Sequence, residues 1–515
     1  MAATSTTHGI VARLAALALA LSAPGALAVP ISAQQNQVEM TLERMVGLTL
    51  SSSYRIRDLN LSIERTRHVL NAQRARLRSR VSLDLSLPEL ESIAEPRWNS
   101  TLGLNEIVHE NSRRWEAQLS IRQPVILFGY PTNGYLSLNN RVYRYTQLEE
   151  DGARDLRYYN RYFVAYTQPL FQPNELKNDL EEAELDLEES ELEFYSDVVD
   201  IVDDLSGDYF ELFEDAYGRE VNDRLVANLE IAVSAAEELA QADPTRSIDL
   251  DQARVELANA EEQLQQSRSQ FRLQAASLKT RLSLAESDSI TLDPQIVLSP
   301  VPIDVEQATR YALELTPRMR ELDIEYRMNQ LDLDEERGEN AFRVDLEFSY
   351  GRERQDPRFG NLWDRPTNTY TIDVNAYIPI WDWGQRRSRI QASMVSLRQT
   401  ELEMDETVTQ IVSNVTNEAR NVEEFQTRAL NMERNLGLAS GLSASSLELY
   451  REGSASILDV LQSFRRQVDT ANNLLDAYLG WRRALLRMQQ LTYFDFELGV
   501  PVLERFGVTL PEDET

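Results

Sequence analysis

The sequence predicts a mainly helical fold that also contains β-strands of membrane-spanning length. The same order of helices and strands is predicted in both halves of the chain. Three observations lead to this prediction. Apolar residues recur every three or four positions over two very long stretches, shorter stretches alternate apolar and polar residues, and constant offsets relate the two halves of the chain. We expect about four strands per chain. Because a closed barrel needs about eight strands at least, so few strands predict an oligomer.

The N-terminus predicts an exported protein. Arg13 precedes the apolar stretch LAALALALSAPGALA, and Ala26, Leu27 and Ala28 fit the small-x-small pattern of a signal-peptide cleavage site. We therefore assign residues 1–28 to a signal peptide, with a second candidate cleavage after Ala33. The apolar stretch is too short for a transmembrane helix, and no later window approaches the length needed. If the mature chain enters a membrane, we expect it to do so as a closed β-barrel.

Charge and residue usage exclude several classes of function. The net charge of −32 argues against nucleic acid or an anionic membrane surface as a partner. In the acidic stretch DLEEAELDLEESELEF the carboxylates alternate with periodic apolar residues, so we interpret it as a solvated helix face rather than an acidic binding tail. The chain has no cysteine, which excludes disulfides, thiolate nucleophiles and cysteine-based metal centres.

An internal duplication explains how the chain is organised. Residues 40–64 align with 303–327 at an offset of 263, and residues 166–176 align with 376–386 at an offset of 210. Constant offsets over such lengths are hard to obtain by chance. Each half then reads helix, strand, loop, strand, long helix, break and helix.

The change of offset locates an extra 53 residues in the first copy, near 90–160. Two added strands would raise a three-chain barrel from about twelve to about eighteen strands, but an extracellular hairpin is the simpler hypothesis. The second offset continues to the pair Asp249 and Asp459. The predicted units are a first repeat at 29–299, a second repeat at 300–497 and an acidic tail at 498–515.

Two long amphipathic rods dominate the helical prediction. Residues 174–240 and 385–449 carry apolar stripes whose steps of three and four average 3.6. Each rod would be on the order of 100 Å long. Each also opens a helical hairpin, at 174–286 in the first repeat and at 385–495 in the second. Such rods need neighbours to cover their stripes.

Alternating stretches predict the strands. Residues 342–350, 369–379 and 115–123 each set apolar side chains on one face and polar ones on the other. A half-buried sheet in a soluble core gives the same pattern. Export, strand lengths near ten residues, charged opposite faces and aromatic ends favour membrane strands within 342–379 instead.

Few residues suggest chemistry. His8 lies in the signal peptide, His68 lies in a charged helical stretch, and His109 is predicted in a loop without a second histidine. No phosphate-binding, nucleophile-elbow, zinc or dinucleotide motif is present. We therefore expect no enzyme activity, no catalytic residue, no metal site and no cofactor.

The two helix breaks are the better candidates for function. AQADPTRSIDLDQ and YREGSASILDVLQ interrupt the two hairpins, through Pro244 in the first and Gly453 in the second. Asp249 and Asp459 follow within the first turn of the next helix. A carboxylate there complements the helix dipole, so capping alone could explain both residues.

At this point the sequence resembles the TolC-like outer-membrane factor family, the outer membrane efflux proteins. The resemblance covers nearly all of the mature chain. It is carried by the duplicated plan, by the corners QPLF and IPIWDWGQRRSRI, and by Tyr450, Gly453, Asp459, Val460, Leu461, Ala471 and Tyr478.

The resemblance implies a homotrimer with a β-barrel in the outer membrane and a long α-helical barrel in the periplasm. It implies a passive conduit for efflux or type I secretion, whose partners are a periplasmic adaptor, an inner-membrane transporter and outer-membrane lipid. The alternative function is a periplasmic coiled-coil adaptor or scaffold without a pore. An adaptor would carry compact β-domains with glycine-rich turns.

The resemblance also implies a channel entrance at the breaks. Asp459 falls where the family lines the entrance with acidic residues, and Tyr450 falls in its closed-state hydrogen-bond network. Gln462 stands where the family prototype has a second acidic residue, and Ala455 where it has a basic one. The expected entrance residues are Asp459, Tyr450, Gly453, Gln462 and Asp249.

Overall fold

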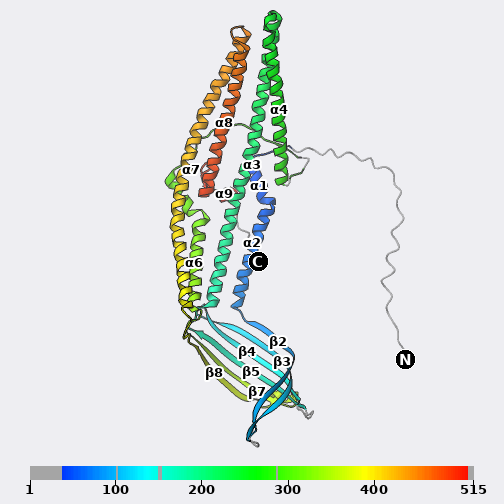
Figure 1. The fold of residues 1–515 in the computed structure, drawn as a ribbon, viewed down its shortest axis with the longest axis vertical. Helices are drawn as coiled ribbons and strands as arrows, with labels where there is room; N and C mark the ends of the chain where they lie inside the picture. Colours follow the sequence, from blue (N-terminus) through cyan, green and yellow to red (C-terminus); the bar gives the residue numbers. More distant parts are fainter. Residues whose placement is uncertain (1–36, 100–102, 149–153, 283, 286–287, 509–515) are drawn as a thin grey trace, which may run out of the picture.

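The computed structural model describes residues 37–508 apart from 100–102, 149–153, 283 and 286–287. The predicted signal peptide and residues 509–515 of the predicted tail lie outside the described residues. One twisted sheet occupies one end of the molecule, and long helices run away from it to two hairpin tips at the other end (Figure 1).

The sheet contains six antiparallel strands in the order β2-β3-β4-β5-β7-β8. Their bounds are β2 Arg80–Asn99, β3 Leu104–Leu127, β4 Tyr130–Leu148, β5 Arg154–Leu170, β7 Arg343–Asp356 and β8 Thr367–Tyr377. The prediction of about four strands was wrong. The extra residues of the first repeat contribute most of β3 and β4, and both strands pair within the sheet, so the hypothesis of a separate hairpin was also wrong.

One face of this sheet is apolar and uncovered. A single row of directly paired side chains crosses all six strands. The row is Val81, Ile121, Leu138, Val164, Tyr350 and Tyr370. Five of these side chains are exposed, from 43% at Val164 to 75% at Tyr370. The opposite face is mostly polar at the same level, where Ser137, Ala165, Ser349 and Thr371 pair in a row.

Eight helices of ten residues or more occupy the described part of the chain. Their bounds are α1 Leu42–Ser52, α2 Tyr54–Arg76, α3 Glu175–Ala242, α4 Ser247–Arg281, α5 Val305–Glu314, α6 Pro317–Gly338, α7 Gln385–Arg451 and α8 Ile457–Thr492. The rods predicted at 174–240 and 385–449 are therefore α3 and α7. In space, α2, α3, α6 and α7 pack in that order next to the sheet.

Short elements complete the described chain. They are β1 Gln37–Glu39, β6 Ser289–Thr291, η1 Pro244–Arg246, η2 Phe359–Trp363, β9 Phe494–Asp495, β10 Val500–Pro501 and α9 Val502–Arg505. β1 pairs in parallel with β6, which joins the start of the first repeat to the end of its hairpin.

Two hydrophobic clusters hold the helices together. The larger lies at mid-height, where Phe213 and Trp481 join α3 to α8, with Met45 and Ala312 from the shorter helices. The smaller lies near the tips and is rich in alanine on α3 and α4, with Tyr450 and Phe464 from the second hairpin. Small side chains let the two hairpins approach closely, so the rods stay in contact up to their ends.

Candidate functional site

The two hairpin turns lie at the end of the molecule opposite the sheet (Figure 1). In the first turn α3 ends at Ala242, and η1 begins with Pro244, which cannot continue a helix. In the second turn Gly453 has φ +77°, the left-handed conformation in which glycine ends helices at little cost. The sequence therefore breaks the two rods by two different residues at matching places.

Asp459 caps its own helix. Ser456 Oγ accepts a hydrogen bond from the Asp459 backbone N–H at 3.2 Å, and Asp459 Oδ2 accepts from Ser456 Oγ at 2.7 Å and from its backbone N–H at 3.2 Å. This is a reciprocal capping box at the start of α8. The hydrogen bonds from Ser456 hold the pKa of the exposed Asp459 carboxyl below its ordinary value.

Asp249 has a different partner. The N-terminus of α4 has no side-chain capping hydrogen bond. Instead Asp249 Oδ2 accepts from the Tyr450 hydroxyl at 3.5 Å, a contact that joins the first hairpin to the second. Tyr450 is fully buried, and this burial, with the nearby Asp249 carboxylate, raises the pKa of its hydroxyl to about 12. The hydroxyl therefore stays protonated and able to donate at physiological pH.

Of the predicted entrance residues, the structure brings Tyr450, Asp249 and Gly453 to one seam between the hairpins. Gln462 is exposed on α8, one turn beyond Asp459. Asp459 points its carboxylate back to Ser456 rather than to the first hairpin.

Sequence reasoning missed Arg246. This residue occupies the N-cap position of α4, and a Cβ placed on Gly453 would lie 3.9 Å from its Nη2. The offset of 210 could have found it, because that offset aligns Arg246 with Ser456. A charged residue standing where the second repeat has its helix cap was a signal that the two turns differ.

Ion pairs support the seam below the turns. Arg465 on α8 donates from both Nε and Nη2 to Glu256 on α4, at 3.0 and 2.9 Å. Arg254 pairs with Glu237 within the first hairpin at 2.6 Å. Exposed pairs of this kind contribute little individually, but the two-pronged arginine pair fixes the register of α4 against α8.

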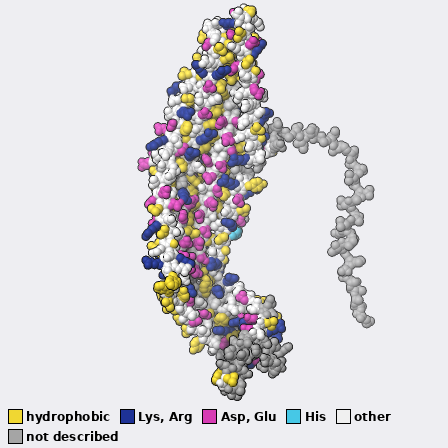
Figure 2. All heavy atoms as spheres, in the orientation of Figure 1, with side chains coloured by type: hydrophobic (Ala, Val, Ile, Leu, Met, Phe, Trp, Pro, Cys, Tyr) yellow, Lys and Arg dark blue, Asp and Glu magenta, His cyan; other side chains and the backbone are white. Residues whose placement is uncertain are grey.

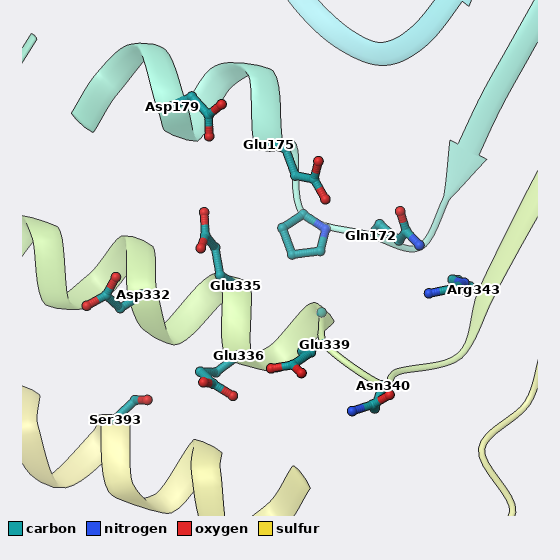
Figure 3. Close-up of a pocket in the computed structure, with 12 residues that line it drawn as sticks. Gln172, Glu175, Asp179, Asp332, Glu335, Glu336, Glu339, Asn340, Arg343 and Ser393 are labelled. Carbon is teal, nitrogen blue, oxygen red and sulfur yellow. The ribbon is translucent and has the colours of Figure 1, made fainter. Parts of the chain in front are cut away.

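A second candidate site lies where the helices meet the sheet. A cavity of about 760 Å³ is lined by carboxylates from α3 and α6, with Arg343 at the start of β7 (Figure 3). The acidic members are Glu175, Asp179, Asp332, Glu335, Glu336 and Glu339. Desolvation and neighbouring carboxylates raise the pKa of Glu335 above its ordinary value. Within the described chain no group of His, Asp or Glu has an arrangement able to hold a metal ion.

Exposed aromatic side chains surround the same junction. Figure 2 shows a hydrophobic patch between the helices and the sheet. The most exposed aromatic side chains there are Phe128, Tyr130, Phe171, Trp381 and Trp383, at 70–100%. They lie on or next to the connections between strands and helices, and membrane proteins often place aromatics at the lipid–water boundary.

The histidines add no site. His68 is exposed on α2, as predicted, 3.6 Å from Glu64. The prediction that His109 lies in a loop was wrong, because residue 109 pairs with residue 94 inside the β2–β3 ladder.

Solved outer-membrane channels share this fold. The outer-membrane channel OprN matches with a TM-score of 0.63 at 15% identity, over 88% of this chain and 89% of OprN. VceC from Vibrio cholerae matches with a TM-score of 0.62 at 14% identity, over 88% and 96%. CmeC from Campylobacter jejuni matches with a TM-score of 0.57 at 12% identity, over 94% and 95%.

Long helices that carry one open sheet are thus a fold that this chain shares with these solved proteins. In sequence, residues 311–492 match the family model described as outer membrane efflux protein. The resemblance inferred from the motifs is confirmed by this match, which covers the greater part of the second half of the chain. A search of curated protein sequences gives no match. In the part of the chain that the structure describes, no helix combines the length and the apolarity needed to cross a bilayer.

Proposed function

We propose that this protein is the outer-membrane channel of a tripartite efflux or type I secretion system. Its sheet would lie in the outer membrane and its helices would cross the periplasm, where a periplasmic adaptor and an inner-membrane transporter dock. The observation that carries the proposal is the uncovered apolar face of the sheet. A soluble protein would cover such a face, whereas a membrane strand presents it to lipid.

The two edge strands of the sheet, with the helices attached to them, support the closure of a ring by identical copies of the chain. β2 and β8 are the free edges of the sheet. A short link joins α2 to β2, and residues 378–384 join β8 to α7. Both helices carry unpaired apolar residues, with Leu61 at 60% exposure on α2 and Leu402 at 69% on α7. One edge of a copy can therefore meet the other edge of the next, which closes a ring. Three copies would supply about eighteen strands.

The hairpin tips would form the periplasmic entrance. Three copies of Asp459 and Asp249 around one mouth would favour cations over anions. The part-buried hydrogen bond between Tyr450 and Asp249 would help to hold the tips closed. Replacing Asp459 with Ala and recording single-channel currents tests this assignment, since an unchanged cation preference would remove Asp459 from the constriction.

A pair of neighbouring substitutions tests the membrane location. Ile372 is 69% exposed on the apolar face of β8, and Thr371 is its neighbour on the polar face. Ile372→Asp should destabilise the strand in lipid, by less than the about 2–4 kcal/mol that arginine costs at mid-membrane, and abolish heat-modifiable trimers in the outer-membrane fraction. Thr371→Asp is the matched control and should assemble normally.

The same pair separates the channel from its alternative, a periplasmic adaptor without a pore. If the protein were such an adaptor, Ile372→Asp would leave assembly unchanged, and the wild-type chain would fractionate with soluble periplasmic proteins. The long strands that continue into helices in both repeats favour the channel.

A further inference from the structure

Four arginines lie on the apolar face of the sheet, farther from the helices than its apolar row. They are Arg113 on β3, Arg144 on β4, and Arg352 and Arg354 on β7, and we call them the arginine belt. Side chains of a strand alternate between the two faces, and the pairing of β3, β4, β5 and β7 has no register shift between the apolar row and these residues. Each arginine lies nine to 14 residues from the helix end of its strand. A strand needs about 9–11 residues to cross a bilayer, so the belt lies near or beyond the far side of one.

The belt crosses the sheet obliquely. Arg113 pairs with Thr146, and Arg144 lies two residues nearer to the helices than Thr146. Arg144 shares a paired row with Asp356, and Arg354 lies two residues nearer to the helices again. The belt therefore approaches the helices from β3 to β7.

The helix end of the sheet slopes in the same direction. β2 begins at Arg80, which shares a paired row with Thr371, and β8 continues for six residues past Thr371 toward the helices. Membrane strands are tilted by about 35–45°, so a line of constant depth crosses the paired rows obliquely. The belt therefore runs roughly parallel to the junction of helices and sheet, as residues at one depth in a membrane would.

The belt is positively charged on the surface of an acidic protein. Asp356 is the only carboxylate on the apolar face among the strand residues that the structure describes, and it pairs with Arg354 at 3.1 Å. Arg144 is exposed, and no carboxylate in the described part of the chain pairs with it. The opposite face carries charges of both signs, such as the two-pronged pair of Arg141 with Glu116. On this sheet, an excess of arginine over carboxylates is thus a property of the face that would contact lipid.

Aromatic side chains lie beside the belt. The guanidinium of Arg113 lies 5.4 Å from the ring centroid of Trp115, and Tyr158 shares the paired row of Arg144. The ring of Tyr158 contacts Phe359 edge-on, with the two ring centroids 5.5 Å apart. Aromatic rings favour the boundary between lipid and water, and arginine binds phosphate through two parallel hydrogen bonds. Together these side chains fit a lipid headgroup.

We propose that the arginine belt binds the phosphate groups of an anionic lipid in the leaflet farther from the helices. Charge complementarity supports this partner, because the guanidinium groups lie where the headgroups of that leaflet would lie. The net charge of −32 repels anionic surfaces from the molecule as a whole, so the attraction would be local to the sheet. The proposal rests on the proposed function, since it requires the apolar face to contact lipid.

The experiment measures which lipid the full-length chain prefers. The protein is reconstituted into phosphatidylcholine vesicles that contain a trace of either spin-labelled phosphatidylglycerol or spin-labelled phosphatidylcholine. Electron spin resonance then gives the fraction of each label that is immobilised at the protein surface. We expect a preference for phosphatidylglycerol of about two- to fivefold, since one arginine at a membrane surface contributes up to about fivefold. Sodium chloride should reduce this preference by screening the charges.

A double substitution tests the belt itself. Arg113→Gln with Arg144→Gln removes two of its charges and should lower the preference to less than half. Arg122→Gln with Arg157→Gln is the matched control. It removes the same charge from two exposed arginines of the opposite face of the sheet, so the preference should change little.

Three results would overturn the proposal. They are equal association of both lipids with the wild-type chain, an unchanged preference in the belt variant, and an equal loss in the belt variant and its control. Inorganic phosphate gives a further arm. If it abolished the preference where sodium chloride of the same ionic strength did not, the arginines would form a site for the free ion rather than for lipid.

The proposed function is tested separately, by whether the wild-type chain enters the vesicles at all. A chain that stayed outside the vesicles would contradict the membrane location, and the belt with it. Entry without a preference for phosphatidylglycerol would contradict the belt alone.

Discussion

The two hairpin turns align at an offset of 210 residues, yet they use their aspartates in different ways. In the second turn Asp459 and Ser456 satisfy each other, and the helix end is closed within itself. In the first turn Arg246 replaces the capping serine, so Asp249 is free to accept from Tyr450 on the other hairpin. One turn is therefore self-contained, and the other turn makes the contact between the repeats.

The difference shows how two similar turns can form a contact between hairpins. A cap stabilises the start of each helix, but a link between the hairpins needs a free acceptor in one of the two turns. With arginine rather than serine at position 246, α4 lacks a side-chain cap, which contributes about 1 kcal/mol in typical helices. The missing cap also leaves free a carboxylate whose partner lies across the seam. Substitutions in the two turns should therefore have unequal effects.

Tyr450→Ala should have the largest effect. Tyr450 is fully buried in the cluster beneath the turns, and removing a large buried side chain typically costs about 3–5 kcal/mol. Hydrogen exchange of the amides in both tips should show a lower free energy of local opening by about this amount. The first turn should loosen as well as the second, because Tyr450 contacts both hairpins.

Two control substitutions separate the packing of Tyr450 from its hydrogen bond and from the effect of its position in the helix. Tyr450→Phe removes only the 3.5 Å hydrogen bond and should cost about 0.5–1.5 kcal/mol. Leu449→Ala changes a side chain that is 47% exposed and should cost less than Tyr450→Ala. If Leu449→Ala loosened both tips as much as Tyr450→Ala, packing at Tyr450 would not be what joins the hairpins.

Gly453→Ala should have the second-largest effect, confined to the second turn. An alanine at φ +77° costs about 1–2 kcal/mol in backbone strain, although a Cβ there meets only ordinary contacts. Gly437→Ala is the control with the opposite sign. Gly437 lies inside α7 with no atom within 4 Å of a Cβ, so alanine should stabilise by about 0.5–1 kcal/mol. Equal signs in urea unfolding would contradict this interpretation of Gly453.

Much of the fold could be predicted from the sequence because its signals are periodic and local. The 3.6-residue stripes place α3 and α7, and Pro244 and Gly453 place the turns. The strands within the extra residues near 90–160 were underestimated, since alternation shows that a segment is extended but not which strand it pairs with. Pairing of β3 with both β2 and β4 depends on contacts far apart in sequence.

The candidate site was predicted less completely, for a related reason. The aspartates, the tyrosine and the glycine carry signals in their own stretches of sequence. The link between Asp249 and Tyr450 joins residues 201 positions apart, and the approach of Arg246 to Gly453 likewise joins the two hairpins. Sequence spacing can place each residue on a turn, but only packing between the repeats shows which of them meet.

Ser456→Ala should have a smaller effect that sharpens the comparison. The substitution removes the cap of α8 and should lower the free energy of opening of the second tip by about 1 kcal/mol. Ser247→Ala, in the first turn of α4, removes a serine from a helix start without a side-chain cap and should be nearly neutral. Hydrogen exchange at the two helix starts would show the contrast. A comparable loss at both would indicate that the two turns are capped alike.

The smallest effect should be a pH dependence with two opposite components. Burial and neighbouring carboxylates raise the pKa of Glu182 and Glu335 above 4.5, so the folded state binds these protons more tightly than the unfolded state. Stability should therefore rise as the pH falls from 7 toward 5. The pKa of Asp459 is lowered below 3.8, so its contribution should be lost only at more acidic pH, as the pH falls through its folded value. Thermal unfolding at several pH values would measure both parts.

Substitutions test which region causes each part of the pH dependence. The junction of helices and sheet should cause the rise toward pH 5, and the second hairpin turn should cause the loss at more acidic pH. Glu182→Gln with Glu335→Gln should flatten the rise between pH 7 and 5, because the repelling charges next to the sheet are gone. Glu424→Gln, an exposed residue of α7, should leave that rise in place. Asp459→Asn should instead remove the loss at acidic pH and lower stability at neutral pH. If the double glutamine variant kept the full rise, repulsion at the junction would not be its source, and the acidic helix faces elsewhere would have to carry it.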